Sequence, residues 1–125
     1  MTSIVDQYQY HHMGIPTTEV KPGEIYHAGF KFTSTPFLAN AFRIQWHRFD
    51  EDSSLHPLIQ SVPHVAFKVP SIEEAMGDYE VLLAPYEPIP GYKVVIVAVD
   101  GAPVAFVQTD LSDEVLGGYE ATVAL

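Results

Sequence analysis

The sequence predicts an α+β fold built from two βαβββ modules, the first of which has a reduced helix. The strongest indication is the segment 63–76, where a strand leads directly into a capped helix. A weaker copy of the start of this segment occurs at residues 10–16, and residues 43–49 correspond in the same way to residues 104–108. These two correspondences indicate an internal duplication.

The segment 63–76 combines the signals of a strand and of a helix start. Apolar residues alternate with other residues from position 64 to 69, which is typical of a strand with one apolar face. Pro70 ends this strand, and Ser71 with Glu74 has the spacing of a capping box. The helix is expected to pack on the apolar face of the strand, so that His64 points to the opposite face.

In the first half, strands are expected at residues 7–15, 31–34 and 41–49. Residues 16–24 are rich in turn formers, residues 24–32 fit either a short helix or an irregular strand, and residues 35–40 form a loop. Alternation along 41–49 separates the residues into two faces: Phe42, Ile44 and Trp46 lie on one, and Arg43, Gln45 and His47 on the other. Phe42, Trp46 and Phe67 are expected in the core. His11 is expected to face away from His12.

In the second half, a polar connection at 50–61 with one helical turn near Leu58 leads to the strand and helix of 63–79. Strands are then expected at 80–84, 92–99 and 103–109, with a rigid proline-rich bend at 85–91. Asp100-Gly101 is a strong hairpin signal. Ser112 can cap a short helix that ends at Gly117-Gly118.

The 125 residues are expected to form one domain, with module one at about 8–50, module two at about 62–110 and a C-terminal tail at 111–125. Residues 1–7 are expected to form a loose lead-in. A net charge of −10 with only six scattered Lys and Arg residues argues against nucleic acid as a partner. There is no apolar run long enough to span a membrane, no secretion signal and no cysteine. A cytoplasmic protein without a membrane partner is therefore expected.

Four phrases in this order resemble the vicinal oxygen chelate superfamily, which includes glyoxalases, bleomycin-resistance proteins and extradiol dioxygenases. They are HMGIP at 12–16, HVAFKV at 64–69, SIEEA at 71–75 and DGAPVAFVQ at 100–108. The resemblance covers about residues 8–109. It implies two modules whose sheets curl around a shared cleft, and commonly a homodimer.

The resemblance also implies a metal site with one ligand from the first and one from the last strand of each module. The matching positions are His12, Gln45, His64 and Ala105. Ala105 has no ligating atom and stands where a glutamate is usual, and Gln45 replaces a second one. Two imidazoles and an amide oxygen hold hard divalent ions poorly. His47 lies two residues after Gln45 on the same face and would be the source of a third nitrogen.

Two functions stay open at this point. The first is a binding module without metal, in which Arg43, Gln45, His47, His12 and His64 contact a small polar or aromatic molecule. The second is a lyase, isomerase or dioxygenase with Zn, Ni, Mn or Fe held by His12, His64 and Gln45. Ala105 favours the first function and the histidine pair favours the second. No catalytic residue is identified. Arg43 would bind an anionic ligand group, or equally form a salt bridge to an acidic loop.

Overall fold

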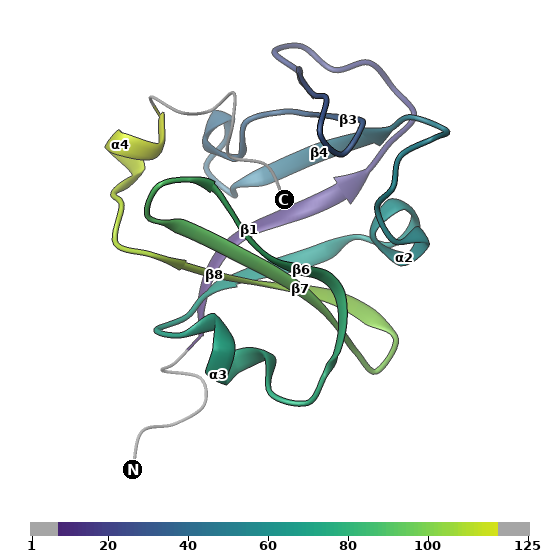
Figure 1. Cartoon of the computed structure of the whole chain (residues 1–125). Coiled ribbons are helices and arrows are strands. Elements are labelled where there is room, and N and C mark those ends of the chain that lie inside the picture. Colours follow the sequence, from purple (N-terminus) through teal and green to yellow (C-terminus); the bar gives the residue numbers. More distant parts are fainter. Residues whose placement is uncertain (1–7, 118–125) are drawn as a thin grey trace.

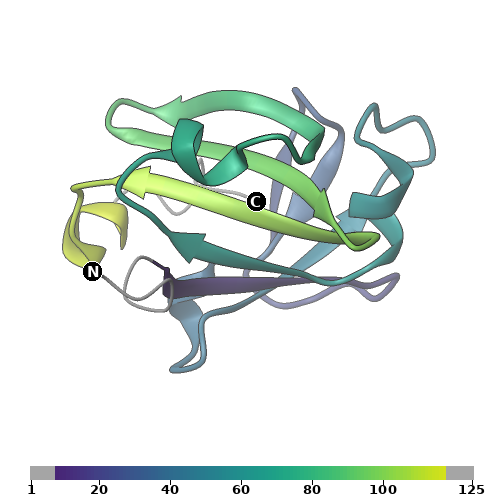
Figure 2. The ribbon, with the colours of Figure 1, turned by 90° about the horizontal axis from the view of Figure 1, so that it is seen from below.

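The computed structural model describes residues 8–117, and eight strands of this part form one curled sheet (Figures 1 and 2). The strands are β1 Gln9–Pro16, β2 Ile25–His27, β3 Phe32–Ser34, β4 Ile44–Phe49, β5 His64–Lys68, β6 Glu80–Ile89, β7 Tyr92–Val99 and β8 Ala102–Thr109. The helical segments are η1 Phe37–Ala39, α2 Pro57–Ser61, α3 Ile72–Met76 and α4 Asp113–Gly117. An α+β fold is therefore confirmed.

The strand order is β2-β3-β4-β1-β5-β8-β7-β6, which divides into two halves of four strands each. In each half, the first and last strands in sequence pair in parallel, as β1 with β4 and β5 with β8. The halves meet where β1 and β5 pair antiparallel. The second half contains helix α3 after its first strand, whereas the described chain of the first half has no helix between β1 and β2.

The two faces of the sheet are packed differently. On the outer face, Ser71 Oγ accepts a hydrogen bond from the backbone N–H of Glu74 at 3.2 Å and caps α3, as predicted. Helix α3 contacts β7 and β8 (Figure 1). The apolar residues of this layer are Val69, Ile72, Val95, Val97 and Phe106, with Phe67, Ala75 and Met76 packed against them. This layer shields the outer face of the second half from water.

The inner face of the sheet, which carries Ala66 and Ala105, holds the larger core. Its buried residues are Phe32, Phe37, Leu55, Ile59, Ala66, Ile89, Tyr92, Val94, Ile96, Ala105, Val107 and Leu116. They come from both halves and from η1, α2 and α4. The three short helical segments therefore help to close the inner face.

Two predictions about elements are wrong. Strand β6 does not end at residue 84 but continues to Ile89, so Pro85 and Pro88 lie within a strand and not in a bend. It lies at the edge of the sheet and its register with β7 shifts three times, which accommodates residues without an N–H group. Strand β4 begins at Ile44, and Phe42 is 74% exposed outside the core.

Two other element predictions are confirmed: α2 is the helical turn near Leu58, and β7 has the predicted bounds. The segment 24–32, which fitted either a helix or a strand, contains the short strand β2 at residues 25–27. Asp100 and Gly101 both have positive φ, at 51° and 80°, which is the conformation of a type I′ hairpin turn. No helix within residues 8–117 is long and apolar enough to cross a membrane. The predicted lead-in 1–7 and the tail beyond Gly117 lie outside the described residues.

Candidate functional site

Strand β1 brings two consecutive histidines into the interior. His12 lies opposite Ala66 in the ladder with β5, and the register shifts between Tyr10 and His12. Because this irregularity breaks the alternation, His11 is also buried, and its Nδ1 lies 2.8 Å from Nδ1 of His12. One of the two nitrogens carries the proton and donates to the other. The prediction that His11 faces away from His12 is therefore wrong.

Strand β4 supplies Gln45 and His47, both of which are buried. Gln45 pairs with Gly14 in the parallel ladder, and Nε2 of His47 lies 2.9 Å from Oε1 of Gln45. An amide oxygen can only accept, so His47 carries its proton on Nε2 and donates it. Nδ1 of His47 is then unprotonated and can only accept a hydrogen bond, and it has no hydrogen-bond partner among the described residues.

Strand β5 places His64 opposite Gly14 and against the ring of His47. The two imidazoles are stacked, with centroids 5.5 Å apart and planes 10° apart. His12 meets His64 edge-on at 5.9 Å. A Cβ atom at Gly14 would lie 2.3 Å from Cε1 of His64 and 2.6 Å from Cε1 of His47. The stacked pair therefore fills the space that any side chain at position 14 would need.

Both stacked imidazoles are neutral at physiological pH. Burial lowers the pKa of His64 to about 4. Burial, followed by the proximity of His64 and His27, holds the pKa of His47 well below its usual value of 6.5. Nε2 of His64 also lacks a hydrogen-bond partner within residues 8–117. The site thus presents uncharged rings with hydrogen-bonding capacity that the described chain does not use.

Arg43 does not lie in the strand with Gln45 and His47. It precedes β4 with a left-handed φ of 60°, so the alternation of that strand does not reach it. Its guanidinium binds Asp113 of α4 through Nη1 at 2.7 Å and Nη2 at 3.2 Å, and its Nε donates to the carbonyl of His11. This contact lowers the pKa of the Asp113 carboxyl. Arg43 was expected either to bind an anionic group of a ligand or to form a salt bridge, and in the structure it forms a salt bridge with Asp113.

The expected shared cleft is closed at this position by the chain itself. The side chains of His12, Gln45, His47 and His64 are at most 1% exposed. The ring of Phe37 in η1 stacks on His12 at 5.2 Å and also contacts His11 at 5.0 Å. A recess of about 200 Å³ lies beside α4, and His11 forms part of its wall with Arg43, Lys68 and Asp113.

The expected ligand positions, His12, Gln45, His64 and Ala105, are not arranged to bind a metal ion in this structure. Within residues 8–117, no group of three or more His, Asp or Glu side chains is placed to bind a metal. Ala105 is fully buried beside Ala66 and contributes only a methyl group. Oε1 of Gln45 and Nδ1 of His12 already face other side chains. No reaction step through a metal is therefore derived.

Comparison with known proteins supports the fold and leaves the family undetermined. No family model matches the chain, and no curated protein does. The chain is similar in structure to a hypothetical protein BH1468 from Bacillus halodurans C-125, with a TM-score of 0.59 and 15% sequence identity. The similarity covers 84% of this chain and 96% of that chain. At this level of identity, it indicates a shared fold alone.

Sequence reasoning missed several residues that shape the site. These are Gly14, Phe37 and Leu116. Tyr92 is fully buried, its ring lies 5.8 Å from that of His11, and its hydroxyl has no partner among the described residues. Burial raises the pKa of this hydroxyl far above its usual value. Gly14, two residues after His12 in the predicted strand, is the signal in the sequence that pointed to close packing there.

Proposed function

We propose that this chain is a glyoxalase-like small-molecule-binding protein of the vicinal oxygen chelate superfamily, with its binding site on the inner face of the sheet and without a complete metal site. The support is the resemblance of residues 8–109 together with the two four-stranded halves, each with its first and last strands in parallel. His12 and Gln45 come from one half and His64 from the other. The resemblance also leads us to propose a homodimer, which light scattering would test.

The observation that carries the proposal is the stacked pair His47 and His64. Each ring has a nitrogen without a hydrogen-bond partner in the described chain, in a protein interior where such groups are normally paired. Nδ1 of His47 is an acceptor, so the fitting ligand brings an O–H or N–H donor. Neutral rings and aromatic walls suit an uncharged, partly apolar molecule.

Such a ligand must displace the side chains that close the site. Phe37 and Leu116 belong to η1 and α4, two short helical segments that lie outside the sheet. Segments of this kind open at lower free energy than the central strands. Binding is therefore expected to be accompanied by movement of η1 and α4 and not by distortion of β1, β4 or β5.

The test compares phenol with anisole, which has the same ring without the donor hydroxyl. We expect phenol to shift the imidazole resonances of His47 and His64 in NMR titrations of the full chain, and anisole to have a much smaller effect. Replacing His64 by Leu should abolish the phenol effect. His56→Asn is the matched control, because His56 is exposed and caps α2 through a side-chain acceptor that Asn also provides.

Two results would count against the proposal. Equal shifts with phenol and anisole would show that the histidines make no hydrogen bond to the ligand. Near-stoichiometric metal in protein purified without chelator, lost in His64→Ala, would instead support the metal-dependent alternative with His12, Gln45 and His64.

A further inference from the structure

The two segments that close the inner face contact each other, although they come from opposite halves of the sequence. A Cβ atom added at Gly117 of α4 would lie 3.9 Å from Cδ1 of Leu38 in η1. Phe37 of η1 and Leu116 of α4 are buried in the same inner core. Neither segment takes part in the strand order of the sheet. Together they cover part of the inner face, and we call them the η1–α4 lid.

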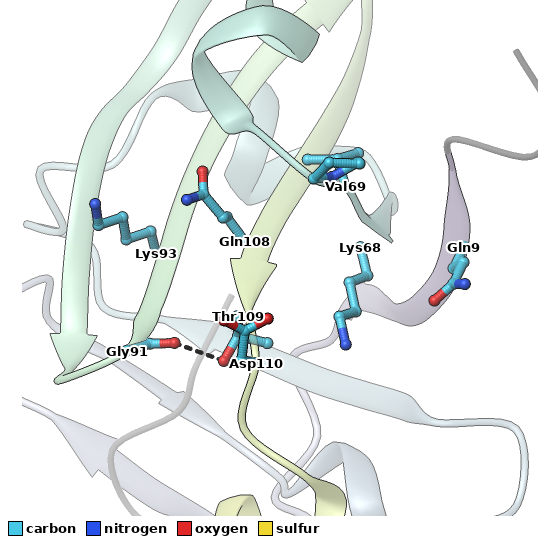
Figure 3. Close-up of a pocket in the computed structure, with 9 residues that line it drawn as sticks. Gln9, Lys68, Val69, Gly91, Lys93, Gln108, Thr109 and Asp110 are labelled. Atoms are coloured by element: carbon cyan, nitrogen blue, oxygen red, sulfur yellow. Dashed lines mark hydrogen bonds between the residues drawn. The ribbon is translucent and has the colours of Figure 1, made fainter. Parts of the chain in front are cut away.

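The α4 half of this lid is anchored to the sheet at its base. The hydroxyl of Thr109, the last residue of β8, donates to the carbonyl of Gly91 at 2.6 Å, at the rim of a surface hollow (Figure 3). The same oxygen accepts from the N–H of Leu111 at 3.1 Å, and the Leu111 side chain packs beside Gly91. The chain is therefore fixed as far as Leu111, and a movement of α4 would begin after that residue.

The side chain of Arg43 contacts both halves of the lid and the sheet beneath them. Its guanidinium binds the carboxylate of Asp113 in α4 through Nη1 at 2.7 Å and Nη2 at 3.2 Å. Its Cζ atom lies 5.0 Å from the centre of the Phe37 ring in η1, within the range of a cation–π contact. Its Nε donates to the carbonyl of His11 in β1. One planar side chain thus joins α4, η1 and β1.

The backbone holds Arg43 in this position. Its φ of 60° lies in the left-handed region, which residues other than glycine seldom adopt. Its N–H donates to the carbonyl of Asn40 at 3.2 Å, and its carbonyl accepts from the N–H of Met13 at 3.1 Å. A conformation of this kind persists where the surrounding structure requires it. The turn before β4 therefore directs the guanidinium to the lid.

The ion pair is the part of this arrangement that solvent reaches. The side chain of Asp113 is 61% exposed and that of Arg43 is 21% exposed. Both line the recess beside α4, together with His11 and Lys68. An ion pair in such a position is weak and breaks easily, whereas its two-pronged geometry favours the same closed arrangement each time it re-forms. These are the properties of a contact that opens and closes.

We infer that the ion pair between Arg43 and Asp113 joins η1 and α4 into a single lid, so that the two segments open together and admit a ligand to the inner face. This control of ligand entry rests on the function proposed above. The coupling of the two segments does not, because Arg43 contacts both of them without a ligand. Since the open lid is the form that binds, the fraction of open molecules scales the apparent affinity.

Hydrogen exchange, followed by NMR on the full chain, tests the coupling at two amides. The N–H of Ala39 in η1 donates to the carbonyl of Pro36, and the N–H of Leu116 in α4 donates to the carbonyl of Ser112. If one opening exposes both, the two amides should have the same protection factor. The amides of the buried strand β7 should be protected more strongly.

Two variants remove the link between the segments. Asp113→Asn should accelerate exchange at both Ala39 and Leu116 roughly threefold, as expected for the loss of a partly exposed ion pair. Arg43→Gln should accelerate both further, because it also removes the contact with Phe37. The amides of β7 should keep their exchange rates in Asp113→Asn. The same variant should tighten phenol binding by the factor measured at Leu116.

Glu114→Gln is the control, since it removes an equal charge from an exposed residue in the same turn of α4. It should leave exchange at Ala39 unchanged. The inference is overturned if Asp113→Asn accelerates Leu116 alone, if it accelerates the β7 amides equally, or if Glu114→Gln has the same effect on Ala39. Faster exchange with unchanged phenol affinity would overturn the control of ligand entry. The exchange experiment needs no ligand, so a chain that binds no phenol refutes the proposed function and leaves the coupling to be decided by exchange.

Discussion

At the scale of single residues, Gly14 sets the packing of the two stacked imidazoles. We expect Gly14→Ala to destabilise the protein by roughly 1–3 kcal/mol, because the added methyl group would overlap Cε1 of both His47 and His64. The free energy of unfolding from urea titrations measures this. Gly29→Ala is the control, since a Cβ atom at that exposed position meets nothing within 4 Å. A Gly14→Ala protein as stable as the unmodified chain would mean that the rings are not held as described.

The residues of the site could be predicted only as far as strict alternation holds. It correctly turns His64 to the face opposite α3, and it places Gln45 and His47 together. Alternation fails at His11, which lies at a register shift between β1 and β5. It also fails at Arg43, whose backbone has a left-handed φ. Both irregularities depend on pairing with distant strands, so no local pattern of residues reveals them.

At the scale of elements, α4 is attached to the inner face through the buried side chain of Leu116 and through the ion pair between Asp113 and Arg43. Leu116 is 2% exposed in the core, whereas its neighbour Val115 is 43% exposed. We expect Leu116→Ala to cost roughly 2–5 kcal/mol and Val115→Ala less than about 0.5 kcal/mol. Thermal unfolding compares the two variants. Equal effects would show that α4 does not close the inner face.

The proline-containing strand shows why some elements escape a local prediction. Pro85 and Pro88 normally indicate a break, and the hydrophobic pattern before them is short. Strand β6 tolerates them because it pairs with β7 alone and its register slips along the ladder. The position of a strand at the edge of a sheet follows from the topology, which these few residues do not encode.

At the scale of the whole molecule, the buried histidines make stability depend on pH. Burial lowers the pKa of His64 to about 4, and burial together with Arg43 and Lys68 lowers that of His11 to about 4, against 6.5 in an unfolded chain. Between pH 6.5 and about 4 the unfolded state therefore binds more protons, and the folded state loses stability as the pH falls. Each of the two groups contributes about 3 kcal/mol over this range, at about 1.4 kcal/mol per pKa unit.

Urea titrations at several pH values measure this dependence. The free energy of unfolding should fall steeply from pH 6.5 to 4, and the slope should be smaller in His64→Leu. Equal stability at pH 7 and pH 4.5 would contradict the neutral, buried state of these rings.

The closed inner face is the feature of the whole molecule that could not be predicted from the sequence. A shared cleft was expected from the resemblance, whereas Phe37 and Leu116 come from a loop and a tail that carry no strong periodic pattern. Whether a curled sheet stays open depends on how such segments pack after the sheet has formed. That packing is a property of the complete chain and not of any strand in it.

The central position of β1 also affects how the protein is made. The ribosome releases β1 first, yet its two neighbours are β4 and β5, which begin at Ile44 and His64. Strand β5 in turn pairs with β8, which ends at Thr109. Strand β1 therefore does not have both of its neighbours until Lys68 has been synthesised, and β5 lacks its second neighbour until Thr109 has been added.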